Sequence, residues 1–156
     1  MLFGWWMLAC SGMSEDAVEV TTEPTEESID LADWVSELPG TWLGNAETPM
    51  GSMPFAMEGE ATEMGVRTSI ERSGLLISLA FTSTPDGWVL TERGELPGGF
   101  VQQHDLVPVS IDGSEVRFLS IEEGLMDLVT SVEDGTWDLE VDVRGLPHVS
   151  WTLQRL

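Results

Sequence analysis

Residues 137–144 read Trp-Asp-Leu-Glu-Val-Asp-Val-Arg, so every odd position is apolar and every even position is charged. Side chains of a β-strand point alternately to its two faces, so this stretch predicts a strand with one face in a core and the other in water. Val149, Trp151 and Leu153 repeat the pattern in the last residues of the chain. The C-terminal end therefore indicates an antiparallel β-protein.

Similar alternating segments precede this stretch from Gly40 onward, and the strongest apolar face runs from Leu75 to Phe81. Three stretches between them have the composition of tight hairpin turns: 85–87, 112–113 and 134–135. Closing a long meander removes its exposed edges. The sequence therefore predicts an all-β fold, a single antiparallel up-and-down β-barrel of about eight to ten strands.

One short helix is expected before the barrel. Leu31, Trp34, Val35 and Leu38 follow the spacing of one helical face, and Pro39-Gly40 ends it. A helix of about two turns is not stable alone, so its apolar face must pack on the sheet. We place the barrel domain at residues 29–156.

The N-terminus is apolar up to Cys10, the only cysteine. Met7-Leu8-Ala9-Cys10 resembles a bacterial lipobox. The resemblance implies a lipoprotein-type signal at residues 1–10, secretion across the inner membrane, and an anchor on lipidated Cys10 in the outer membrane or at the periplasmic face. The alternatives are an accidental apolar N-terminus or part of a single uncleaved anchor.

Residues 11–28 are rich in Glu, Thr and Ser and poor in large apolar side chains. Such a segment cannot bury enough surface to offset its ordering entropy, so we expect an acidic, disordered linker. The formal charge of the whole chain is −22, with six arginines and no lysine. We therefore expect no binding to nucleic acid, and attachment to a membrane only through the lipid. The sequence predicts no particular protein partner.

Gly40-Thr41-Trp42-Leu43-Gly44 follows the helix and opens the first strand. This stretch resembles the Gly-x-Trp opening of the calycins, the lipocalin and fatty-acid-binding-protein group. In that group a tryptophan of the first strand is covered by an arginine from the last strand, so the resemblance implies a contact between Trp42 and Arg155. Cation–π attraction would support it. The alternative is that Trp42 is an ordinary core residue.

Leu146-Pro147-His148-Val149 is similar to the closing segment of the nitrobindin-like haem barrels. That resemblance implies that His148 ligates haem iron from inside the barrel. The strand period instead puts His148 opposite Val149, Trp151 and Leu153, so a surface histidine is the competing interpretation.

Inward positions of the predicted barrel give the candidate ligand-binding residues. They are Phe55, Met57, Leu79, Phe81, Trp88 and Leu90, with the polar Gln102 and His104. Residues 48–55 are apolar and irregular, with two prolines and two methionines, and are interpreted as a loop at the barrel mouth. That loop could be a ligand lid, or it could fold over the barrel's own end.

No catalytic pattern is visible. His104 and Asp105 are neighbours on one strand, so their side chains point to opposite faces and cannot form a dyad. The carboxylates of Asp138, Glu140 and Asp142 are interpreted as a solvated outer face. We expect no enzyme, no metal site and no cofactor, but a lipid-anchored envelope barrel that binds a small apolar ligand. The alternatives are a structural or interaction lipoprotein with a filled barrel, and the haem barrel.

Overall fold

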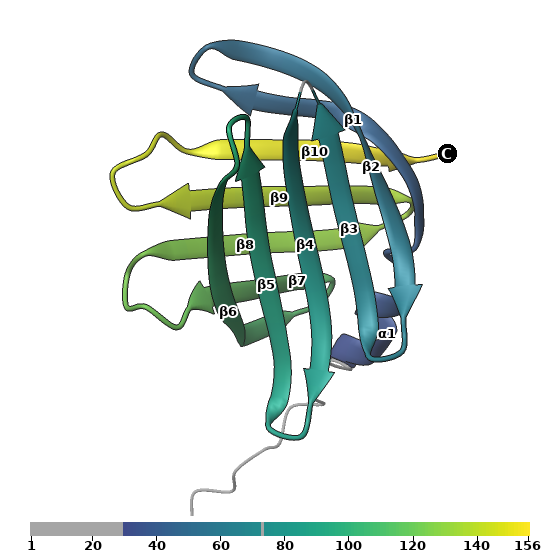
Figure 1. The fold of residues 1–156 in the computed structure, drawn as a ribbon. Coiled ribbons are helices and arrows are strands. Elements are labelled where there is room, and N and C mark those ends of the chain that lie inside the picture. The colour runs from purple at the N-terminus through teal and green to yellow at the C-terminus, as the bar shows by residue number, and fades with distance from the viewer. Residues whose placement is uncertain (1–29, 73) are drawn as a thin grey trace, which may run out of the picture.

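The computed structural model describes residues 30–72 and 74–156. One short helix precedes ten antiparallel strands that close into a single barrel, which confirms the predicted fold class (Figure 1). The elements are α1 (Leu31–Ser36), β1 (Gly40–Thr48), β2 (Gly51–Thr62), β3 (Gly65–Arg72), β4 (Leu75–Thr84), β5 (Gly87–Leu96), β6 (Phe100–Asp112), β7 (Glu115–Ser120), β8 (Met126–Glu133), β9 (Thr136–Val143) and β10 (Val149–Arg155). The predicted signal with Cys10 and the predicted linker lie outside the described residues.

Closure of the barrel takes place between its first and last strands. β10 pairs antiparallel with β1, and the register sets Trp42 opposite Arg155 and Gly44 opposite Leu153. The two strands are so close at Gly44 that a Cβ atom there would lie 1.9 Å from the carbonyl oxygen of Thr152. Gly44 is therefore the residue that lets β1 and β10 meet.

Helix α1 covers one end of the barrel, which we call the closed end. Asp30 caps the helix by accepting a hydrogen bond from the Ala32 amide at 3.0 Å. The Trp34 ring meets the edge of Phe81 at 5.5 Å, and its indole N–H donates to the Ser114 carbonyl at 3.1 Å. No helix in the described part of the chain is long and apolar enough to cross a membrane.

Trp42 connects this helix to the closing strands. Its side chain is fully buried, and its Nε1 donates to the Leu38 carbonyl at 2.9 Å. The guanidinium carbon of Arg155 lies 4.8 Å from the centroid of the Trp42 ring, so the expected contact is present. Arg155 also donates to the Glu37 carbonyl. The closed end is therefore one connected unit of α1, β1 and β10.

The turn signals identify the hairpins correctly at three places and wrongly at one. Two-residue turns join β4 to β5, β6 to β7 and β8 to β9, as predicted. Residues 48–55, however, are not an irregular loop, because β2 already begins at Gly51. Thr48 closes the turn by donating to the Gly51 carbonyl at 2.9 Å, and Gly51 supplies a φ of 118°. The prediction of a loop rested in part on Pro49 and Pro54, but Pro54 lies within β2.

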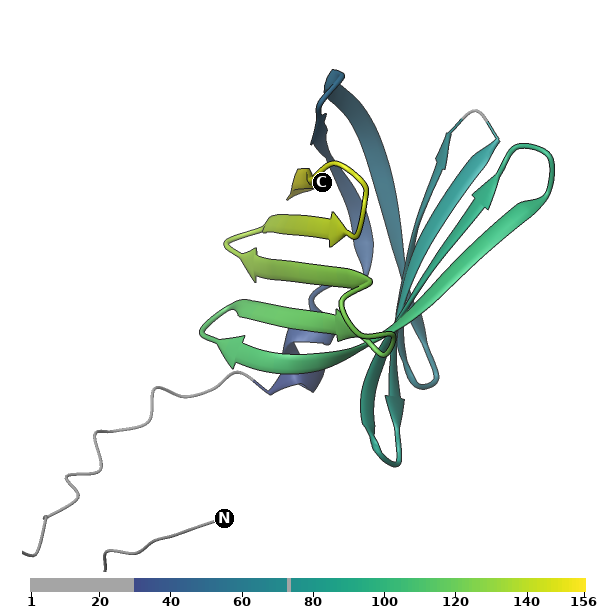
Figure 2. The same cartoon turned by 90° about the vertical axis from the view of Figure 1, so that its left-hand side faces the viewer.

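Away from the closed end, at what we call the mouth, the barrel divides into two parts (Figure 2). β2 pairs with β3 only from Glu58 to Thr62, and β6 pairs with β7 only from Leu106 onward. Beyond those points β3–β6 form a four-strand flap, and β7–β10 with β1 and β2 form a six-strand flap. Pro54 is tolerated in β2 because this part of the strand faces a seam, which Arg72 spans by donating to the Pro54 carbonyl at 2.9 Å.

Closure through Gly44 leads to a stability prediction. We expect Gly44→Ala to lower the free energy of unfolding by about 1–3 kcal/mol, because the added methyl group overpacks the β1–β10 pair. Gly94→Ala is the matched control, because the Cβ added there would meet only the Glu92 carboxylate, at 3.8 Å. Urea unfolding followed by circular dichroism measures both. Equal stability of the two variants would contradict the proposed role of Gly44.

Candidate ligand-binding site

The interior of the barrel has a filled floor near the closed end. Inward-facing side chains there are almost completely buried and pack on one another and on α1. The largest fully buried side chains of this floor and of the helical segment that covers it are Trp34, Trp42, Trp137, Phe81, Phe118, Leu38, Met57, Leu90, Leu106, Leu128, Leu139 and Leu153. A floor packed in this way leaves no room for a ligand at this level.

Nearer the mouth, the inward-facing residues are only half-buried. Phe55 on β2, Ile77 on β4, Val141 on β9 and Trp151 on β10 are all of this kind. Phe55 and Trp151 stack edge to face at 5.6 Å on the six-strand flap. Phe55, Val141 and Trp151 pack on the buried floor with part of their surface and leave the rest exposed between the two flaps. At the same level of β5, a Cβ atom added to Gly94 would meet only the Glu92 carboxylate, at 3.8 Å. We call this region between the flaps, above the floor, the cup.

Large apolar side chains continue onto the rim of the cup. Met50 and Leu146 lie in connections at the mouth, and Leu96 and Phe100 are the strand ends that flank the β5–β6 connection there. These four residues are 92, 63, 44 and 62% exposed, respectively. By contrast, Asp86 and Asp134 lie in turns at the closed end. Exposed apolar residues therefore lie around the entrance of the cup.

The predicted lining residues all lie on inward-facing positions, but at different heights. Met57, Leu79, Phe81 and Leu90 belong to the floor, where they pack rather than line a space. Trp88 lies beside the β4–β5 turn at the closed end, opposite Ser83. The remaining three predicted residues, Phe55, Gln102 and His104, reach the level of the cup.

Sequence reasoning missed Glu92, which also faces the cup. It comes two residues after buried Leu90 on β5 and lies opposite His104 on β6. Burial raises the pKa of the Glu92 carboxyl, and the nearby His104 partly offsets that shift. The alternation of Leu90, Glu92 and Gly94 was the signal that could have identified it.

In the described part of the chain, no other side chain forms a hydrogen bond with Glu92 or His104. Nor are the Glu92 carboxylate and the His104 ring hydrogen-bonded to each other. Asp105, the neighbour of His104, points outward and accepts a 2.7 Å hydrogen bond from Thr91. A small cleft of about 230 Å³ adjoins His104 where β6 separates from β7, lined also by Ser120 and Leu125.

His148 lies outside the barrel. It sits in the connection before β10, its side chain is 50% exposed, and its Nδ1 is 2.9 Å from the outward-facing Asp142 carboxylate. An iron ligand would have to project into the interior. The position of His148 therefore gives the haem hypothesis no support.

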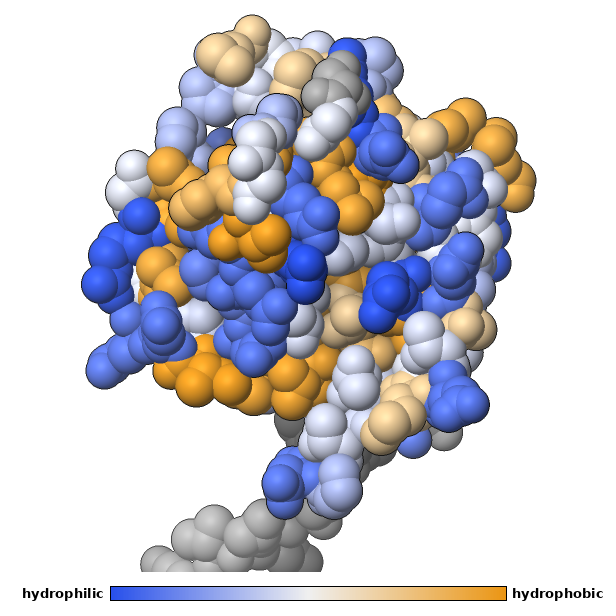
Figure 3. Space-filling model, viewed as in Figure 1, coloured by the Kyte–Doolittle hydropathy of each residue, from blue (hydrophilic) through white to orange (hydrophobic). Residues whose placement is uncertain are grey.

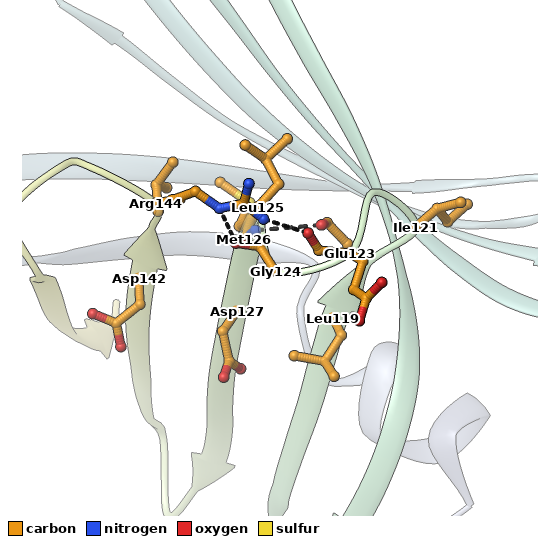
Figure 4. A pocket seen from close by; sticks show the side chains of 11 residues that line it. Leu119, Ile121, Glu123, Gly124, Leu125, Met126, Asp127, Asp142 and Arg144 are labelled. Carbon is orange, nitrogen blue, oxygen red and sulfur yellow. Dashed lines mark hydrogen bonds between the residues drawn. The ribbon is translucent and has the colours of Figure 1, made fainter.

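A second cleft, of about 570 Å³, lies among the loops of the mouth (Figure 4). Arg144 is the cation in it, but its Nε donates to the Gly124 carbonyl at 2.9 Å and a second nitrogen donates to the Glu123 carbonyl. Asp127 and Asp142 also line this cleft. An anion would therefore meet two carboxylates and a guanidinium that is already used to hold the loop.

The outer face of the four-strand flap carries a shallow groove of about 610 Å³, where the surface is mainly hydrophilic (Figure 3). Small side chains such as Ser78 and Ala80 form its base. Arg93 at its edge is paired with Glu95 at 2.7 Å. Among the described residues, no three His, Cys, Asp or Glu side chains gather closely enough to hold a metal ion.

Comparisons with known proteins add little to this geometry. No family model matches the chain, and no curated protein matches it. Among solved structures, it is similar to a redesigned β-barrel that is 15% identical, with 83% of this chain and 98% of that chain covered and a TM-score of 0.39. A likeness of this size carries no argument about function.

The raised pKa of Glu92 leads to a prediction about pH. Because the folded state holds the proton more tightly than the unfolded state, this residue destabilises the fold as the pH rises through its folded pKa. We expect Glu92→Gln to raise the melting temperature at about pH 7, and the gain to shrink at about pH 3, where the carboxyl group is mostly protonated in both states.

Glu140→Gln removes the same charge from an exposed position on the outer wall of β9 and serves as the control. Differential scanning fluorimetry at the two pH values measures all three proteins. A Glu92→Gln variant that is no more stable at neutral pH than Glu140→Gln would contradict the desolvation of Glu92.

Proposed function

We propose that the barrel binds a small apolar ligand in the cup. The observation that supports this most directly is the half-burial of the inward-facing apolar residues near the mouth, above a floor that is fully packed. Leaving such side chains accessible to water forgoes about 25 cal/mol for each Å² that could have been buried. An apolar ligand would recover part of that free energy.

A filled structural barrel is the competing function from a different class. The packed floor agrees with it, since an ordinary barrel of this kind needs no ligand to be stable. The open seams and the apolar rim favour the ligand-binding proposal, because a purely structural barrel gains nothing from a wide, apolar entrance.

We also propose that the protein is a lipoprotein of the bacterial cell envelope, anchored through Cys10 and related to the calycins. The lipobox-like residues 7–10 support the anchor. The contact between Arg155 and Trp42, after a Gly-x-Trp opening, supports the kinship. A protein held near a membrane is close to a store of apolar small molecules, which agrees with an apolar cup.

Binding of a neutral apolar dye to the full-length protein tests the cup. We expect N-phenyl-1-naphthylamine to bind at micromolar concentration with increased fluorescence. Gly94→Leu should weaken this binding at least tenfold, because Gly94 lies on the same face of β5 as Leu90 and the added side chain would occupy the open cup.

Ala80→Leu adds similar apolar volume to the outer face of β4 and should leave binding unchanged. Failure of the dye to bind the wild type, or equal weakening by the two variants, would favour the filled barrel.

Metabolic labelling tests the anchor separately. In a bacterial host that expresses the full chain, we expect radioactive palmitate in the wild type and none in Cys10→Ser. Immunoblotting of both proteins controls for expression. Equal labelling of the two, or labelling of neither, would contradict the proposed lipidation.

A further inference from the structure

The polar groups of the cup define its ligand more narrowly. We infer that the cup takes an amphipathic ligand whose apolar tail carries a cationic amine headgroup, and that Glu92 with His104 receives that headgroup. This inference rests on the proposed ligand-binding function and specifies the class of ligand.

Glu92 is positioned as a receptor for a cation. It is half-buried and lies directly above the apolar pair Leu90 and Leu106, which are fully buried in the floor. A carboxylate in such surroundings is poorly solvated, and the described residues give it no hydrogen-bond donor. A bound ammonium group would supply both the opposite charge and the missing hydrogen bonds.

The other polar groups at this level do not favour an anion. Arg72 is the inward-facing arginine of the four-strand flap, and it donates to the Pro54 carbonyl across the seam. His104 and Gln102 share the inner face of β6 with each other and lie opposite Glu92 and Gly94. A fatty-acid carboxylate placed here would meet the charge of Glu92 and no unpaired guanidinium among these residues.

The wall of the cup opposite Glu92 and His104 carries aromatic side chains that suit the apolar tail of the ligand. β5 and β6 lie across the barrel from β10 and β1 in the strand order. Trp151 of β10 therefore lies on the wall opposite Glu92, and Phe55 of β2 packs edge to face against it. A ligand with its headgroup at Glu92 would lay its tail over the floor and against these two rings.

Three probes with the same apolar tail separate the contribution of the headgroup to binding from that of the tail. Dodecylamine, dodecanol and dodecanoate are titrated into the full-length protein at about pH 7.5, below their micellar concentrations, and displacement of N-phenyl-1-naphthylamine is measured. We expect dodecylamine to bind wild type at least tenfold more tightly than dodecanoate. Glu92→Gln should weaken dodecylamine by about tenfold, the scale of one hydrogen bond between charged groups, and should strengthen dodecanoate.

Glu140→Gln, with the same change of charge on the outer wall, should alter none of the three affinities. If dodecanol binds all the proteins but wild type shows no preference for the amine, the headgroup assignment is overturned and the apolar cup stands. If Glu92→Gln and Glu140→Gln reduce amine binding equally, a general charge effect replaces the proposed contact. If no probe binds, both the assignment and the proposed function are wrong.

Discussion

The structure depends on the buried indole of Trp42 and the three connections it makes. Its N–H donates to the carbonyl of Leu38 just after α1, its ring meets that of Trp137 of β9 edge to face at 5.5 Å, and Arg155 of β10 covers it. These contacts join the two ends of the described chain. Because they all lie at the closed end, they secure the floor of the barrel and leave the mouth free to open.

This division of the barrel explains how an unfavourable site can exist in a stable fold. The floor buries many large side chains, whereas the cup leaves apolar surface half-exposed and holds a carboxyl group whose pKa is raised by burial. Each feature of the cup costs stability when no ligand is bound. Departures from good packing and good solvation are expected to concentrate where a protein binds something, with the remainder of the core compensating.

Much of the fold could be predicted because it follows from local chemistry. Strict alternation identifies the strand at 137–144, and an Asp-Gly pair with positive φ at both residues forms the predicted turn at 134–135. The strand at Pro54 could not be predicted, since a proline is acceptable there only because β2 faces a seam. That seam is a property of the closed barrel and of no single segment.

The site was less accessible to sequence reasoning for a similar reason. Alternation gives the face of each strand, so the inward-facing residues were recognised. It does not give the height of a residue along the barrel, which depends on how ten strands are staggered. Phe81 and Phe55 therefore looked equivalent, although one fills the floor and the other faces the cup.

The seams have a further consequence for how copies of the protein behave toward one another. The backbone pairs with a neighbouring strand on one side only in two segments, Phe100 to His104 of β6 and Gly51 to Met57 of β2. Unpaired backbone of this kind is a template for intermolecular sheet formation. Mutual repulsion between chains of charge −22 opposes that encounter. Salt that screens the charge, or acid that neutralises it, removes the protection, so colloidal stability in this protein is electrostatic and depends on ionic strength.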